Sequence, residues 1–144
     1  MWAKRKGVFN KLAARVARTL SARFPKFKYS PVSESGDVEA YIRAPRNSRV
    51  GHLVVLTDKG NIWVRISPPY AFYGVDDMAE LVRIINDVLS DKACFVIVTY
   101  LRKWSETTLV RPNATPRLDS RAGTVQVISW SGKHDRKFRL RKKQ

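Results

Sequence analysis

The chain has little of what metal and cofactor chemistry requires. Its 144 residues include one cysteine and two histidines. One cysteine cannot form an intramolecular disulfide, and this set cannot complete a four-ligand zinc site of the usual Cys/His kind. The glycines form neither a P-loop nor a dinucleotide-binding fingerprint, and no serine lies in a G-x-S-x-G elbow. We therefore expect no metal, no cofactor and a reducing, cytoplasmic compartment.

Long apolar runs are also missing. No stretch approaches the ~20 apolar residues that span a bilayer, and charges interrupt every apolar run near the N-terminus. This argues against integral membrane insertion and against a secretory signal. The 44% of hydrophobic residues and the length of the chain are those of one globular domain with one core.

Acidic residues are absent from the first 33 positions. Residues 1–33 carry nine Lys or Arg and no acid, residues 34–112 carry ten charges of each sign, and residues 113–144 carry nine bases and two acids. The net charge of +16 is therefore concentrated at both ends of the chain, around a neutral middle. Such segregation suits a polyanion-binding protein, because the cations can follow a phosphate backbone. Solvated basic tails with no partner are the alternative.

The clearest helical pattern lies in the middle of the chain. Apolar residues recur at helical spacing from Met78 to Leu89, and either Asp76 or Asp77 can cap the start of this helix. Asp77 with Glu80 has the spacing of a capping box. The apolar run CFVIVTYL (94–101) that follows is short and rich in β-branched residues, which predicts a central strand with Cys94 buried in it.

A second, basic amphipathic helix is predicted over residues 8–24, ended by Pro25. Its apolar stripe can pack on the core and leave the basic face toward nucleic acid, which is the use we favour. A mitochondrial transit peptide, with mitochondria as the second choice of compartment, and a helix lying on an anionic membrane surface are the alternatives.

Alternating and β-branched segments predict the strands. Together the elements predict an α+β fold: a single domain with one mainly antiparallel sheet of five to seven strands, the central helix packed on it, and the basic N-terminal helix. Residues 1–33 form a basic N-terminal extension in this interpretation, 34–131 the α+β core, and 132–144 a basic C-terminal strand and tail. The expected strands are 38–42, the hairpin 52–57 with 61–67 around residues 58–60, a short strand 107–111, and the hairpin 124–131 with 136–143, in which Phe138 and Leu140 face inward.

The basic ends supply the candidate phosphate ligands. Phosphate contacts position a protein but read little sequence, and the chain shows no helix-turn-helix or zinc-finger layout. RNA recognised by its shape is therefore favoured over a specific DNA site. The expected phosphate-binding residues are Lys4, Arg5, Lys6, Lys11, Arg15, Arg18, Arg23, Lys26, Lys28, Arg136, Lys137, Arg139, Arg141, Lys142 and Lys143.

Aromatic residues close to these cations are candidates for base stacking, because exposed rings beside Lys and Arg bind unpaired bases. Most aromatic residues of a chain this size are core or cross-strand packing. We expect one or two of Tyr70, Tyr73 and Trp104 to be exposed.

These features predict a non-enzymatic RNA-binding protein, with a structural role in a ribonucleoprotein assembly and contacts to other proteins there. A small basic ribonuclease or toxin is the runner-up, with His134 as acid or base beside Lys133 and Arg136. A protein-interaction module of the immunity or inhibitor type is the third alternative.

Overall fold

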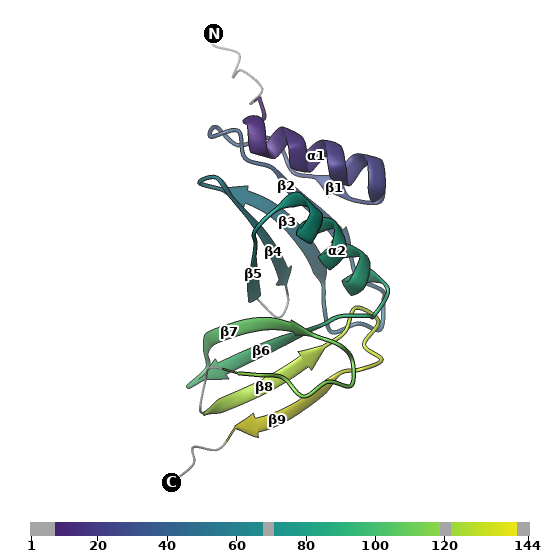
Figure 1. Cartoon of the computed structure of the whole chain (residues 1–144), viewed down its shortest axis with the longest axis vertical. Helices are drawn as coiled ribbons and strands as arrows, with labels where there is room; N and C mark the ends of the chain where they lie inside the picture. The colour runs from purple at the N-terminus through teal and green to yellow at the C-terminus, as the bar shows by residue number, and fades with distance from the viewer. Residues whose placement is uncertain (1–7, 68–70, 119–121, 141–144) are drawn as a thin grey trace.

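The computed structural model describes residues 8–67, 71–118 and 122–140, which form two helices and two antiparallel sheets (Figure 1). The α+β class is therefore confirmed. The elements are α1 (Lys11–Arg23), β1 (Lys28–Tyr29), β2 (Glu39–Arg43), β3 (His52–Asp58), β4 (Asn61–Ser67), β5 (Ala71–Val75), α2 (Met78–Leu89), β6 (Cys94–Tyr100), β7 (Lys103–Val110), β8 (Gly123–Ile128) and β9 (Arg136–Leu140).

The strands divide between two sheets, so the expectation of a single sheet was wrong. The first sheet has the order β1-β2-β3-β4-β5, and the second has the order β7-β6-β8-β9. Successive strands are neighbours throughout the first sheet, whereas in the second sheet β6 lies between β7 and β8. Helix α2 stands between β5 and β6 and carries the chain from the first sheet to the second. Alternation within a strand identifies the strand but not its partner, which is why the division could not be read from the pattern.

The β3–β4 hairpin was predicted, with one difference in its turn. Asp58 pairs with Asn61, so the connection has two residues rather than three. Lys59 and Gly60 both have positive φ, 49° and 79°, as a type I′ turn requires.

Two strands extend beyond the predicted pattern. β5 occupies a segment where no strand was predicted. β7 begins at Lys103, four residues earlier than expected, because Leu101 and Arg102 adopt φ of 50° and 65° and close a two-residue turn directly after β6. Neither residue is glycine, so the residue types did not indicate a two-residue hairpin turn at this position.

The central helix α2 has the predicted bounds and cap. The Asp77 carboxylate accepts a hydrogen bond from the Glu80 backbone N–H at 2.8 Å, and the Glu80 carboxylate accepts one from the Asp76 N–H at 3.1 Å. These contacts satisfy donors that have no partner within the helix. The buried residues of α2 are Leu81, Ile84, Ile85 and Val88.

Helix α1 packs into the same core as α2. Ala13, Val16 and Leu20 are fully buried and belong to one apolar cluster with residues of the first sheet, of α2 and of one face of the second sheet. Both helices lie on the same side of the first sheet (Figure 1). Of the three uses considered for this helix, packing on the core is the one that the structure describes.

A polar network holds the start of α1 against the first sheet. The Asn10 side chain caps the helix through the Ala13 N–H at 2.9 Å and donates to Asp37 at 3.1 Å. Asp37 also accepts from the Thr57 hydroxyl at 2.8 Å, and this bond is the largest cause that lowers the pKa of Asp37. Gly36 has φ +78°, and a Cβ there would lie 2.6 Å from the Val8 carbonyl oxygen, so only glycine fits.

Truncation of Leu20 to alanine tests whether α1 belongs to the core. We expect L20A to lower the free energy of unfolding by about 2–5 kcal/mol, because it leaves a cavity at a fully buried position. Arg18→Ala on the exposed face of the same helix is the control and should change it by less than about 0.5 kcal/mol. Urea unfolding followed by circular dichroism measures both. Equal, small effects would show that α1 contributes nothing to the core.

Asp37→Asn tests the network at the start of α1. A carboxylate with a lowered folded pKa stabilises the protein above its ordinary value of 3.8, and this contribution is lost as pH falls through the folded value. We therefore expect D37N to be less stable than the parent by about 1 kcal/mol at pH 7, and the difference to shrink below about pH 4. Urea unfolding at both pH values provides the test. A difference that is the same at both would mean that the charge of Asp37 has no role.

Candidate nucleic-acid interface

The two basic regions lie at opposite ends of the molecule. Helix α1 is at one end of the long axis and β9 is at the other (Figure 1). On α1 the side chains of Lys11, Arg15, Arg18 and Arg23 are exposed, as are Lys26 and Lys28 after it. The predicted ligands Lys4, Arg5, Lys6, Arg141, Lys142 and Lys143 lie outside the described residues. The predicted phosphate ligands that the structure describes therefore form two separate surfaces.

On β9, alternate residues have different roles. Lys137 and Arg139 pair with Gln126 and Thr124 of β8 and share their face of the second sheet. Arg136, on the opposite face, donates to the carbonyl oxygen of Ala114 at 2.6 Å and so holds the loop after β7. One predicted phosphate ligand thus has a structural contact instead of a free guanidinium.

The predicted orientation of β9 was half right. Leu140 packs against the small cluster formed by Cys94, Val96, Val98, Val125 and Val127. Phe138 has the same parity, but its side chain remains 37% exposed. The loop that covers this face reaches Leu118 and does not enclose Phe138.

The register of the second sheet aligns four residues across one face. Trp104 of β7 pairs with Thr99 of β6, Thr99 pairs with Thr124 of β8, and Thr124 pairs with Arg139 of β9. The neighbouring row is Thr107, Ile97, Gln126 and Lys137. We call these eight residues the open face. Ile97, in the second row, belongs to the core, whereas the first row, which contains Trp104 and Arg139, reaches solvent.

A groove of about 530 Å³ follows the β6, β8 and β9 part of the open face. Its cationic lining residues are Arg102, Lys137 and Arg139, and no carboxylate lines it among the described residues. Thr99, Thr124 and Gln126 add hydroxyl and amide groups. The groove therefore combines positive charge with hydrogen-bonding groups that can serve as donors or acceptors.

The β6–β7 hairpin exposes large apolar side chains beside this groove. Trp104 is 51% exposed, Tyr100 53% and Leu101 78%. The Trp104 indole N–H donates to the Thr107 hydroxyl at 2.7 Å, which holds the ring on the open face. Tyr100 and Leu101 were missed from the sequence, because they end an apolar run that otherwise forms a buried strand.

The other two aromatic candidates differ from Trp104. Tyr73 packs against the core, and this burial raises the pKa of its phenol. Tyr70 lies outside the described residues. Trp104 is thus the exposed residue among the candidates that the structure describes.

The outer face of the first sheet also carries aromatic residues. Tyr41 and His52 form an edge-to-face pair with ring centroids 5.9 Å apart, and Trp63 and Phe72 form another at 6.3 Å. These rings are packed against one another across strands, and Trp63 covers the surface above Gly74. Arg65 on this face is 3.2 Å from Glu39. Cross-strand packing explains this set without a ligand.

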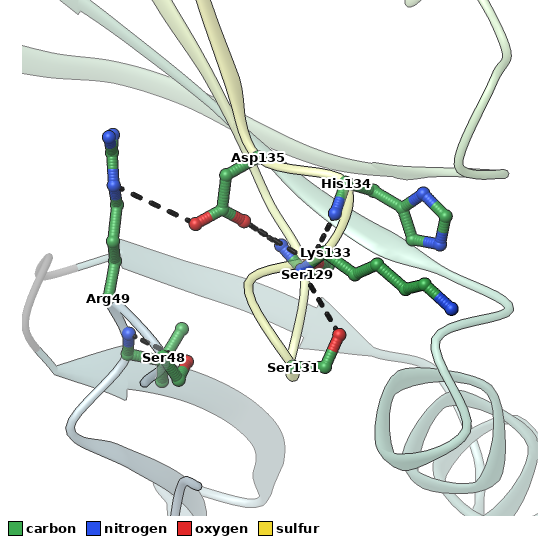
Figure 2. A network of polar contacts seen from close by, with 8 residues as sticks. Ser48, Arg49, Ser129, Ser131, Lys133, His134 and Asp135 are labelled. Atoms are coloured by element: carbon green, nitrogen blue, oxygen red, sulfur yellow. Dashed lines mark hydrogen bonds and ion pairs between the residues drawn. The ribbon is translucent and has the colours of Figure 1, made fainter. Parts of the chain in front are cut away.

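In the turn before β9, the Asp135 carboxylate is bound by Ser129 and Arg49, and not by His134 (Figure 2). The Asp135 carboxylate accepts hydrogen bonds from the Ser129 N–H at 2.8 Å and the Ser129 hydroxyl at 3.2 Å, and it lies 3.8 Å from Arg49. The His134 ring and the Lys133 side chain point away from this carboxylate. The Asp135 side chain therefore organises the turn before β9 rather than the tautomer of His134.

A cavity of about 690 Å³ lies at the end of α2 beside β7. Its charged lining is mixed, with Asp87 and Asp91 facing Arg83, Lys92 and Arg111. Asp91 also accepts from the Ser131 N–H at 3.1 Å, which links this region to the turn before β9. The mixture of signs makes it a weaker anion site than the groove on the open face.

Within the described residues, no three His, Cys, Asp or Glu side chains gather as a metal site would need, and no helix is long and apolar enough to cross a membrane. Comparison with protein-family models, with curated proteins and with solved structures found no match for this chain.

Cys94 is buried within β6, as predicted. Burial raises the pKa of its thiol to about 11, and the negative charges of Asp91 and Asp135 add to the effect. The thiol is therefore protonated at neutral pH and lacks the thiolate that nucleophilic chemistry requires. A structural role in the packing of the second sheet follows.

Alkylation of Cys94 tests this conclusion. At pH 8 we expect iodoacetamide to label native protein at least about 100-fold more slowly than protein unfolded in urea, because the folded thiol is both buried and protonated. Mass spectrometry of quenched samples gives the two rates, with a free-thiol peptide as the reference. Native labelling as fast as that of the peptide would contradict the burial of this residue.

Proposed function

We propose that this protein binds nucleic acid, RNA in preference to DNA, through backbone phosphates and without catalysing a reaction. The observation that carries the proposal is the set of exposed cations on α1 and β9. Neither of the two ion pairs within the described residues, Arg49 with Asp135 and Arg65 with Glu39, uses a cation from either element. Their charge is thus available to a polyanion.

The placement of the cations supports RNA and a structural role. Helix α1 buries its apolar stripe in the core and presents its basic face from a fixed surface, which suits contact with phosphates more than insertion into a major groove. The two basic surfaces at opposite ends of the molecule can contact two segments of one folded RNA. Joining two segments of a folded RNA is a role of structural proteins in ribonucleoprotein assemblies.

The salt dependence of binding tests the proposal. Phosphate contacts release counterions, so log K should fall linearly with log salt, by about 0.7 to 0.9 per phosphate neutralised. For about 6 to 10 contacts the full-length chain should lose on the order of 10³-fold or more in affinity between 50 and 200 mM salt. Fluorescence anisotropy with a structured RNA and with duplex DNA measures this. Weak binding that does not respond to salt would contradict phosphate contacts.

Paired charge substitutions locate the contacts. The double variants K11Q/R18Q on α1 and K137Q/R139Q on β9 should each weaken RNA binding and reduce the salt slope by about 1 to 2. The control R83Q/K92Q removes the same charge from the cavity at the end of α2, outside both surfaces, and should leave the slope unchanged. Gel analysis of the same RNA detects cleavage. Cleavage that His134→Ala abolishes would replace this proposal with the ribonuclease.

A further inference from the structure

The open face has a composition that phosphate contacts alone do not explain. Its outer row begins with an exposed tryptophan, Trp104, and ends with an exposed cation, Arg139, on the far strand. The row crosses four strands, a span of roughly 14 Å at the usual strand spacing. Two threonines, Thr99 and Thr124, lie between the ends. A ligand that touches the whole row must offer both an apolar face and negative charge.

The described acidic residues of the second sheet, Glu106 and Asp135, lie away from the open face. Glu106 pairs with Val98, whose side chain is buried in the small cluster, so register places Glu106 on the opposite face. Asp135 is bound by Ser129 and Arg49 at the far end of β9. The groove along the open face therefore has three cations and no opposing carboxylate among the described residues. Such a groove attracts an anionic ligand over a neutral one.

The tryptophan is positioned before any ligand arrives. Its N–H bond to Thr107 satisfies the polar atom of the ring and restricts its rotation, while about half of the side chain stays in solvent. An exposed ring held in this way loses little conformational entropy when a flat partner stacks on it.

A polyanion with accessible flat faces fits these features, and that is single-stranded nucleic acid. In a duplex the bases are stacked on one another, so Trp104 would meet only sugar and phosphate. In an unpaired strand the bases can stack on aromatic side chains while cations bind the phosphates. An acidic protein surface would satisfy the cations but would leave the indole without a matched partner.

Resting on the proposed nucleic-acid binding, we infer that an unpaired strand lies across the open face, with a base stacked on Trp104 and phosphates on Arg102, Lys137 and Arg139. Thr99, Thr124 and Gln126 contact the same segment through hydroxyl and amide groups. The basic face of α1, at the other end of the molecule, then binds a separate segment. The protein would thereby join an unpaired region to another part of the same RNA.

The test compares four ligands of matched length on the intact protein: single-stranded oligouridine, an abasic single strand, an RNA duplex and inorganic polyphosphate. Trp104→Ala should weaken oligouridine binding about 5- to 150-fold, the range of one base–aromatic stack, and should leave the abasic strand and polyphosphate unchanged. Trp104→Phe should retain most of the affinity. Phe138→Ala, an exposed ring on the opposite face of the sheet, is the matched control and should have no effect.

A second variant avoids dependence on the aromatic residue. Thr124→Glu puts a negative charge in the middle of the row and should weaken oligouridine more than the duplex. Circular dichroism and urea unfolding verify that each variant is folded. If oligouridine binds but neither T124E nor W104A affects it, the inference is overturned while the proposed function stands. If none of the four ligands binds the parent protein, both fail.

Discussion

The burial of β6 on both faces is the constraint on which the structure depends. Phe95 and Ile97 point into the core shared with the helices and the first sheet, whereas Cys94, Val96 and Val98 point into the smaller cluster. Each of these side chains is worth about 1.5–3 kcal/mol when removed from water, less for cysteine. β6 thus packs the second sheet against the core on one face, and on the other face it supports the residues that cover the smaller cluster, Val110, Leu118 and Leu140.

The loop after β7 and the turn before β9 are both held by contacts between residues that are distant in the sequence. The loop after β7 is held over the smaller cluster by Leu118 and by the bond from Arg136 to the Ala114 carbonyl. The turn before β9 is fastened to the first sheet's β2–β3 loop by Asp135 and Arg49, and Gly132 permits its close approach to Asn47. These contacts orient the second sheet, and so they also decide where the open face lies.

The charge of the chain acquires a different meaning once it is placed on this framework. A stretch of cations near each terminus looks like a pair of tails, but α1 and β9 are regular elements. Helix α1 has one side packed and one side in solvent, and β9 is an edge strand in which Leu140 is the partly buried residue. Ordered cations on a rigid surface lose less entropy on binding than cations on flexible segments. Under the proposed function, their separation along the long axis would give contacts with two segments of a nucleic acid rather than one continuous track.

The sequence by itself determined what depends on neighbours along the chain: both helices, the cap at Asp77, the β3–β4 hairpin, the buried β6 and the segregation of charge. Only the tertiary structure decided that there are two sheets and that Trp104, Thr99, Thr124 and Arg139 share a row. The physical reason is register. Alternation states which residues of one strand share a face, but alignment between strands is set by turns such as Leu101–Arg102 and by packing between distant segments. The exposure of Trp104 depends on that alignment, so the sequence made Trp104 a candidate for stacking but did not determine that its ring is exposed.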